Sequence, residues 1–232
     1  IRTKWRVTGV VQGLIEGGVD VLWIETMSSR EEVEAAVAGA ATVGLPIVVT
    51  VSFDTNGRTM MGLSAQDLAQ IEKDSPHKLA ACGTNCGVGA SDLMRTVLGF
   101  VAAGPEQPII AKGNAGIPKY HDGHIHYDGT PDLMADYAVL ARDAGARIIG
   151  GCCGTMPDHL RSMRKALEER APGPRPTLDE IAAWFVEIAV AGKAQTLLTF
   201  LFGLLAAVQL VRAQERGERP TWKALCRINE LL

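Results

Sequence analysis

Short runs rich in Val and Ile alternate with longer stretches of helical periodicity through about residue 170, and few folds accommodate that pattern. The apolar runs are nearly continuous, as expected for parallel strands covered on both faces. The pattern predicts five βα units in an α/β fold. Predicted strands span 20–25, 46–52, 79–86, 108–112 and 146–150, and predicted helices span 29–43, 64–73, 90–103, 130–144 and 157–170.

The number of units leaves two architectures open. A closed (β/α)₈ barrel of the TIM type has eight strands and about 250 residues. Five units therefore indicate either an open doubly wound sheet or the back portion of such a barrel. The breaker cluster APGPRP at 171–176 ends the pattern. We predict a partial barrel domain over 1–171 and a helical C-terminal extension over 172–232.

The extension contains an apolar segment at 194–211, in which 18 consecutive residues carry no charge. This length is at the lower limit for a membrane span. Gln195, Thr196, Thr199 and Gln209 lower its hydrophobicity, so the favoured interpretation is a buried helix that packs on the barrel or on a neighbouring subunit. A membrane association is the less favoured alternative.

Charge and cysteine content exclude several function classes. The 232-residue chain has a formal net charge of −3 and no dense basic stripe, which argues against a nucleic-acid partner. Its five cysteines are too few and too unevenly placed for a disulfide framework. A reducing compartment, the cytoplasm, is therefore expected, and clustered thiols there are typically metal-binding or catalytic.

Three thiols follow the ends of predicted strands. Cys152 and Cys153 lie in GGCCGT, and Cys86 lies in GTNCG. Parallel α/β proteins place their sites at this edge of the sheet. Three thiolates form the ligand set of a catalytic zinc with one open position, although cysteines also occur simply as small buried residues. Cys82 is too far along its strand to share the ion, and Cys226 lies in the distal tail.

A competing metal site involves the three histidines of HDGHIHYD. His121, His124 and His126 are spaced closely enough to hold a metal for a hydrolase reaction. Their segment is rich in Gly and Asp, so a solvated loop is the favoured interpretation. A third alternative is a non-catalytic truncated barrel that serves as a binding or membrane-attached remnant.

Several motifs resemble those of the homocysteine S-methyltransferase family. They are GGCCGT, GTNCG, GNAGIP and the Glu25-Thr26 pair, and the resemblance runs from about Leu14 to Ala171. The stretches SFDTNGRTMMG, NCGVGASDL and AKGNAGIPKYHDGHIHYDGTP are similar to the bacterial betaine-homocysteine type. The resemblance implies a zinc-dependent (β/α)₈ barrel in which these five units are the fourth to eighth.

The resemblance also implies a role for individual residues. Cys86, Cys152 and Cys153 would bind Zn²⁺, and Glu25 would hold the ammonium group of homocysteine. Asn114 would shape the pocket floor, although a plain turn role is equally compatible with its position. The implied reaction transfers a methyl group from a cationic donor to homocysteine and forms methionine. Betaine is the favoured donor, with methylfolate and S-methylmethionine as alternatives.

The resemblance implies that this chain has no counterpart of the family's first three βα units. Those units carry part of the homocysteine site and most of the donor site. Residues 1–11 and those beyond about 181 also fit the family poorly. We therefore expect the 232-residue chain alone to be a poor enzyme. Its two open sheet edges predict association into homo-oligomers.

Overall fold

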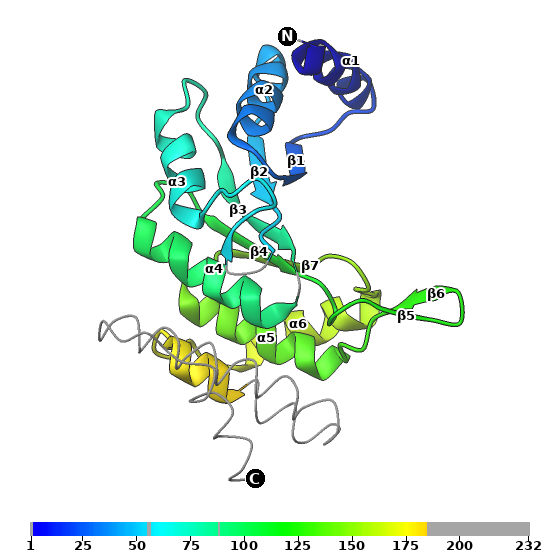
Figure 1. Ribbon diagram of the computed structural model, residues 1–232, viewed down its shortest axis with the longest axis vertical. Coiled ribbons are helices and arrows are strands. Elements are labelled where there is room, and N and C mark those ends of the chain that lie inside the picture. Colours follow the sequence, from blue (N-terminus) through cyan, green and yellow to red (C-terminus); the bar gives the residue numbers. More distant parts are fainter. Residues whose placement is uncertain (1, 55–56, 88, 185–232) are drawn as a thin grey trace, which may run out of the picture. The chain divides into compact units, whose positions relative to one another are not determined.

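Five parallel strands form one sheet in the order β1-β2-β3-β4-β7, as the computed structural model shows (Figure 1). The structure describes residues 2–54, 57–87 and 89–184. Consecutive strands are neighbours throughout, as in the wall of a βα barrel. The strands are β1 (Leu22–Met27), β2 (Ile47–Val51), β3 (Ala81–Cys86), β4 (Ile109–Gly113) and β7 (Ile148–Gly151).

A helix follows each strand of the sheet, and each helix begins close to its predicted start. Ser29, Ser64 and Thr130 accept a hydrogen bond from the backbone at the helix N-terminus, which satisfies donors that the first turn leaves unpaired. The helices are α2 (Arg30–Ala40), extended by a short 3₁₀ turn (Ala41–Val43), α3 (Ala65–Asp74), α4 (Ala90–Ala103), α5 (Pro131–Ala144) and α6 (Pro157–Glu169).

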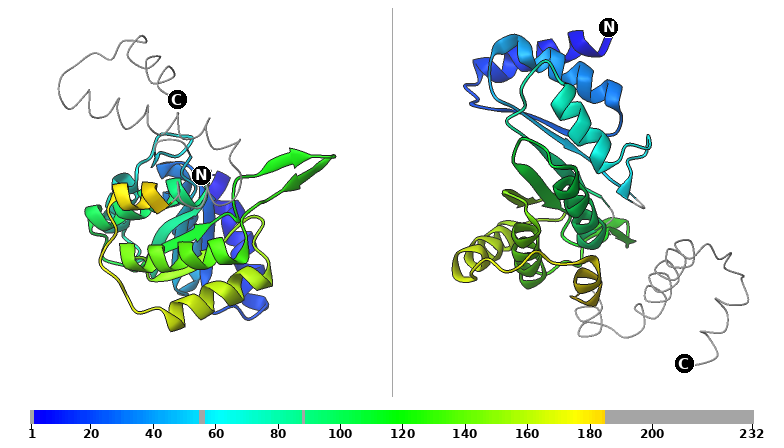
Figure 2. Two further views of the ribbon diagram at one scale, coloured as in Figure 1. Left: turned by 90° about the horizontal axis from the view of Figure 1, so that it is seen from below. Right: turned by 90° about the vertical axis from the view of Figure 1, so that its left-hand side faces the viewer.

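The helices pack against the sheet (Figure 2). A large hydrophobic core lies between the sheet and these helices. Val49, Val51 and Cys82 point from the sheet into this core, where they meet helix residues such as Val33 and Leu68. All five residues are almost completely buried. Side chains alternate across a strand, so the residues between them face the opposite side of the sheet.

That opposite side is the inner face, which corresponds to a barrel interior. Its lower part is a small apolar cluster of Val48, Ala81 and Ile110. Higher up it becomes polar, because Thr50 pairs in register with Gly83, and Asn85 pairs with Lys112. The polar end coincides with the carboxyl ends of the strands, where α/β barrels hold their sites.

Three elements differ from the sequence prediction. An additional helix, α1 (Arg2–Glu16), precedes the sheet and packs on α2. Strand β1 continues beyond its predicted end at Glu25, because an irregularity between Ile24 and Met27 lets pairing with β2 resume. The predicted loop with the histidines is instead an antiparallel hairpin, β5 (Lys119–His121) and β6 (His124–His126).

The two outermost strands, β1 and β7, each pair on one side only among the described residues. Their side chains are correspondingly exposed: Trp23 shows 39% of its surface and Ile148 36%. These open edges agree with the predicted geometry of a partial barrel. The association that they predict stays a prediction.

The described part of the chain ends within a helical stretch at 178–184, which Thr177 caps through Glu180. Residues 1–181 make up one compact unit. Within the described residues, no helix combines the length and apolar character that a membrane crossing requires. The apolar segment at 194–211 lies outside them, and the predicted domain boundary at 171–172 stays a prediction.

Candidate metal centre

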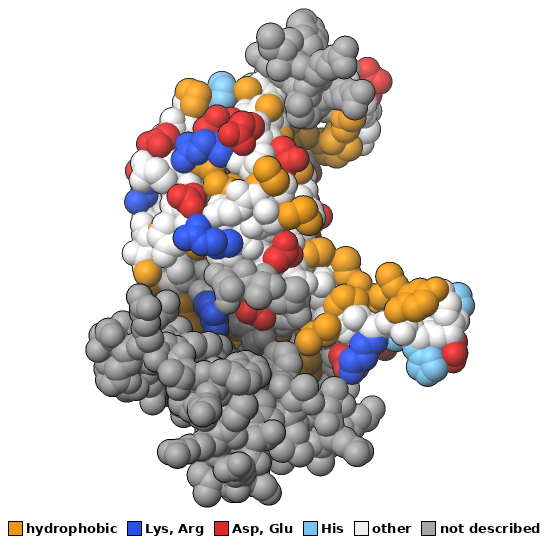
Figure 3. Space-filling view, viewed as in Figure 1, with side chains coloured by type: hydrophobic (Ala, Val, Ile, Leu, Met, Phe, Trp, Pro, Cys, Tyr) orange, Lys and Arg blue, Asp and Glu red, His pale blue; other side chains and the backbone are white. Residues whose placement is uncertain are grey.

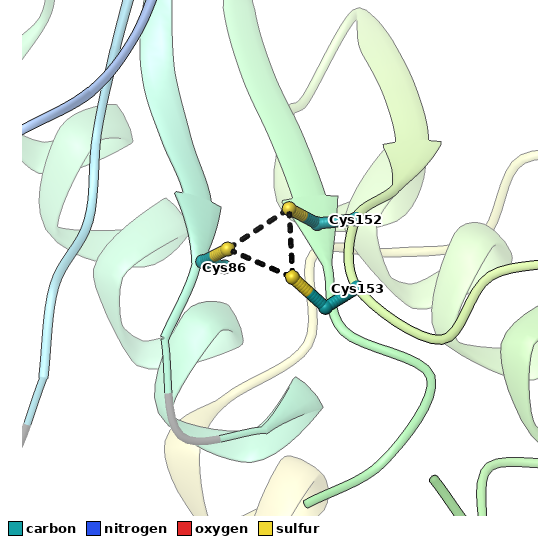
Figure 4. A group of neighbouring side chains, drawn as sticks. All are labelled: Cys86, Cys152 and Cys153. Carbon is teal, nitrogen blue, oxygen red and sulfur yellow. Dashed lines mark hydrogen bonds between the residues drawn. The ribbon is translucent and has the colours of Figure 1, made fainter. Parts of the chain in front are cut away.

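The three cysteines predicted to act together do meet at one point (Figure 4). The Cys86 sulfur lies 2.9 Å from that of Cys152 and 3.6 Å from that of Cys153, and the last two sulfurs are 4.0 Å apart. All three are free thiols. Within the described residues this is the one group of His, Cys, Asp or Glu side chains arranged to hold a metal ion.

Backbone turns at two strand ends direct these thiols to a common point. Cys86 is the last residue of β3 and has a left-handed φ of 58°. Cys152 and Cys153 directly follow β7, where the Cys152 N–H donates to the Gly113 carbonyl at 2.8 Å. The next residue, Gly154, has a φ of 76°, and a side chain there would collide with the ring of Tyr127. Glycine is therefore required for this turn.

The Cys86 and Cys152 thiols differ in pKa. Burial, reinforced by hydrogen bonds with Cys152 and Cys153, raises the pKa of Cys86 to about 12. Burial also opposes ionisation of Cys152, but hydrogen bonds from Cys86 and Asn85 outweigh it and lower the pKa of Cys152. A proton held on Cys86 thus stabilises a thiolate at Cys152.

This inequality predicts the order of alkylation in the metal-free protein. We expect iodoacetamide at mildly alkaline pH to modify Cys152 before Cys86, because a lower pKa leaves more of the thiol as reactive thiolate. Cys82 should react last, since burial raises its pKa to about 12 and also blocks the reagent. Fragment-ion mass spectrometry of timed samples measures the order. Denatured protein is the control, and the same order there would contradict the prediction.

Asn114 joins the backbone segments that carry the two sets of thiols. Its Oδ1 accepts from the Cys153 N–H and its Nδ2 donates to the Gly87 carbonyl, both at 3.0 Å. The side chain is 5% exposed. Asn114 therefore positions the Cys86 and Cys153 backbones relative to each other. Its predicted role in the substrate pocket stays a prediction.

Asn85 makes a second, equivalent connection, which the sequence analysis did not anticipate. Its Oδ1 accepts from the Thr26 N–H at 3.1 Å, and its Nδ2 donates to the Thr26 hydroxyl at 2.8 Å. The same Nδ2 lies 3.9 Å from the Cys152 sulfur. One buried amide thus ties the Glu25-Thr26 turn to the thiol cluster. The sequence feature that could have indicated Asn85 is its position in a buried strand, one residue before Cys86.

The cluster fits a tetrahedral metal ion with one open position. Zinc–sulfur bonds near 2.3 Å place the sulfurs about 3.8 Å apart. Two of the observed separations lie close to this value, while the Cys86–Cys152 pair would have to open by about 1 Å. Cys82 faces the core instead of the cluster, whereas the sequence analysis excluded it by its distance along the strand. Within the described residues no fourth ligand joins the group.

Glu25 lies on the inner face, where it forms an ion pair with Lys112 (β4). The Lys112 ammonium also sits over the Trp23 ring, 4.8 Å from its centre. Trp23 in turn donates from its ring N–H to the Thr50 hydroxyl at 3.3 Å. The sequence analysis missed Lys112, although a single lysine in the apolar strand PIIAK was a usable signal.

The structure does not support the alternative metal site at the histidines. His121, His124 and His126 lie on the exposed β5-β6 hairpin. The His121 ring contacts Asp122, and it lies edge-on to the His126 ring with the ring centres 6.4 Å apart. Figure 3 shows histidines toward the end of this projection and hydrophobic side chains along it. His121 pairs in register with His124, and His126 is two residues further along the strand, so all three lie on one face of the hairpin. Even so, their ring nitrogens do not come close enough together to form a metal-binding group among the described residues.

Comparison with known proteins identifies the class. The family model for homocysteine S-methyltransferase matches residues 4–167, so this chain belongs to that family. The match begins ten residues before the predicted start at Leu14 and includes much of α1. The residues at the N-terminus therefore fit the family better than expected.

Individual relatives agree. The chain is 30% identical over 178 residues to methionine synthase of Mycobacterium leprae and 28% identical over 167 residues to that of Mycobacterium tuberculosis. These matches cover 71% and 69% of this chain but 14% of each relative. The homocysteine methyltransferase MmuM from Escherichia coli, in its apo form, shares the fold with a TM-score of 0.56 and 21% identity. That match covers 70% of this chain and 57% of the other, and it confirms the predicted fold class.

Proposed function

We propose that this chain contributes a zinc-dependent methyl transfer to homocysteine, with betaine as the favoured donor. The observation that carries the proposal is the convergence of Cys86, Cys152 and Cys153 at the strand ends, in a chain of this family. These thiolates would hold Zn²⁺, and the bound ion would supply Lewis acidity that lowers the pKa of a substrate thiol, so that the homocysteine sulfur would be nucleophilic at neutral pH.

The residues around the cluster would bind and orient the substrate. Asn114 fixes the backbones that carry the thiols, and Asn85 links Thr26 to the Cys152 sulfur. Glu25 presents a carboxylate toward the inner face. In the reaction, the sulfur forms a bond to the donor's methyl carbon as the carbon–nitrogen bond breaks. The electron pair stays on nitrogen, which becomes a neutral amine, and the thiol proton passes to solvent. Holding the three reacting atoms in line is the contribution expected of the protein.

A methyl-transfer assay tests the proposal. The zinc-loaded chain is incubated with homocysteine and with betaine, methylfolate or S-methylmethionine, and methionine is measured by mass spectrometry over long incubations. We expect slow, chelator-sensitive formation of methionine that is fastest with betaine. If a zinc-loaded sample forms no more methionine than a Cys153→Ala variant, the alternative of a non-catalytic barrel is correct.

Glu25 provides a separate prediction about substrate binding. Its carboxylate can accept the homocysteine ammonium in a charge-assisted hydrogen bond of roughly 1.5 to 3 kcal/mol. We expect Glu25→Gln to weaken homocysteine binding about tenfold or more while zinc content is unchanged. Isothermal titration calorimetry with homocysteine and metal analysis measure the two quantities. Undiminished homocysteine affinity would mean that Glu25 serves only the fold.

A further inference from the structure

The Lys112–Glu25 ion pair crosses the inner face of the sheet. The two residues belong to β4 and β1, and β2 and β3 lie between these strands. Thr50 of β2 and Gly83 of β3 are small residues that pair in register on the inner face of these intervening strands. The Lys112 side chain also lies against Gly150, where a Cβ would be 3.5 Å from the Lys112 Cγ. The pair therefore occupies the polar end of the inner face.

Lys112 lies slightly further from the carboxyl ends of the strands than the thiol cluster does. It pairs in register with Asn85 on one side and with Gly150 on the other. These residues come one and two positions before Cys86 and Cys152. Two strand residues advance about 6.6 Å. The separation suits an amino acid whose sulfur is three carbons away from its ammonium and carboxylate groups.

Among the described strand residues, Lys112 is the cation placed to pair with a carboxylate at this position. Three thiols and the Glu25 carboxylate make the site anionic when ionised, and an α-carboxylate entering it would be repelled. Lys112 is the only Lys or Arg in the five strands of the sheet. If Glu25 bound the substrate ammonium instead, the Trp23 ring would still hold the Lys112 ammonium in place.

The ion pair is also accessible to a ligand. The Lys112 side chain is 22% exposed and that of Glu25 is 39% exposed. Lys112 contacts Oε1 of Glu25, and among the described residues no donor contacts Oε2. The ion pair therefore has one open acceptor beside one ammonium, a combination that is complementary to a zwitterion.

We propose that Lys112 and Glu25 together form a receptor for the zwitterionic end of the amino acid substrate, in which Lys112 binds the α-carboxylate. This inference rests on the proposed function, because it takes homocysteine as the thiol. Before substrate arrives, the two side chains neutralise each other. On binding, the substrate ammonium faces Glu25 and the substrate carboxylate faces Lys112. The Lys112–Glu25 ion pair is thereby replaced by two charge-assisted contacts with the substrate.

A set of thiols that differ only in their charged ends tests this assignment. The protein is loaded with Co²⁺ in place of Zn²⁺, and the thiolate-to-cobalt absorption band reports binding of each thiol. The probes are homocysteine, 4-mercaptobutanoate, which lacks the ammonium, and 3-aminopropanethiol, which lacks the carboxylate. We expect Lys112→Met to weaken homocysteine and 4-mercaptobutanoate about tenfold or more. The affinity for 3-aminopropanethiol should be kept or increased, because Glu25 loses its competing partner.

Two further variants serve as controls. Lys165→Met removes a lysine on the exposed surface of α6 and should change no affinity. Lys112→Arg keeps the charge and should retain much of the binding of both carboxylates. An equal loss for all three thiols in Lys112→Met, or an unchanged homocysteine affinity, would overturn the assignment.

The unaltered protein gives a second measurement that does not depend on how a variant folds. If Lys112 binds the carboxylate, 4-mercaptobutanoate should bind more tightly than the uncharged 4-mercaptobutan-1-ol. The reverse order would overturn the assignment, since it would show that the anionic site repels the carboxylate. If none of the thiols alters the cobalt band, the proposed function itself fails and the inference falls with it. Binding of thiols without a preference for the carboxylate would reject the inference alone.

Discussion

Cys153→Ala should purify with almost no zinc, whereas the unaltered protein should carry about one zinc ion per chain. Removing one of three thiolates leaves two protein ligands, which are too few to retain the ion against dialysis. Cys153 is exposed, so its replacement removes a ligand without opening a cavity in the core. Metal analysis after dialysis measures the loss, and circular dichroism confirms that the fold is kept.

Cys82→Ala is the matched control for this result. Cys82 lies on the same strand as Cys86, but its side chain belongs to the core between sheet and helices. Its replacement should lower the free energy of unfolding by about 1 kcal/mol through lost packing and leave zinc unchanged. Full zinc content in Cys153→Ala would mean that the ion is held elsewhere.

Asn114→Ala should weaken metal binding about 10- to 100-fold although Asn114 is not itself a ligand, because residues that orient metal ligands have effects of this size. The substitution removes both hydrogen bonds that join Gly87 to Cys153. It also leaves the partly buried Cys153 N–H and Gly87 carbonyl without these partners, which costs up to about 1 kcal/mol of stability. Competition with a chromophoric chelator measures the metal affinity, and urea unfolding measures the stability.

A variant that loses stability far from the site separates the two effects. Ser64→Ala removes the N-cap of α3, where the Ser64 hydroxyl accepts from the Asp67 N–H. This change should lower the unfolding free energy by about 1 kcal/mol and leave metal affinity unaltered. Equal metal affinities in Asn114→Ala and the unaltered protein would show that the cysteine backbones hold their positions without the amide.

The predicted fold was accurate where periodicity and helix caps acted together. All five strands and the five helices that follow them appear, because buried parallel strands and capped amphipathic helices leave strong local signals. Helix α1 was missed, although Val7, Val11 and Leu14 recur at helical spacing. The β5-β6 hairpin was missed because two strands of three residues each give too short an alternation to recognise.

The three thiols of the candidate site were predictable from the sequence, whereas the residues that support them were not. Adjacent thiols between glycines stand out in the sequence, so Cys152 and Cys153 could be singled out. The contact of Lys112 with Glu25 joins residues 87 positions apart, and the contact of Asn85 with Thr26 spans 59. Such contacts depend on the curvature and register of the sheet, which a local pattern does not encode.

Thr26 occupies a backbone conformation that threonine normally avoids, with a φ of 63°. A β-branched residue in this region carries strain on the order of 1 to 3 kcal/mol, and the hydrogen bonds to Asn85 hold it there. Glycine would relieve the strain but would lose the hydroxyl that anchors the turn beside Glu25. Selection for thermostability and selection for turnover would therefore favour different residues at this one position, a conflict typical of functional sites.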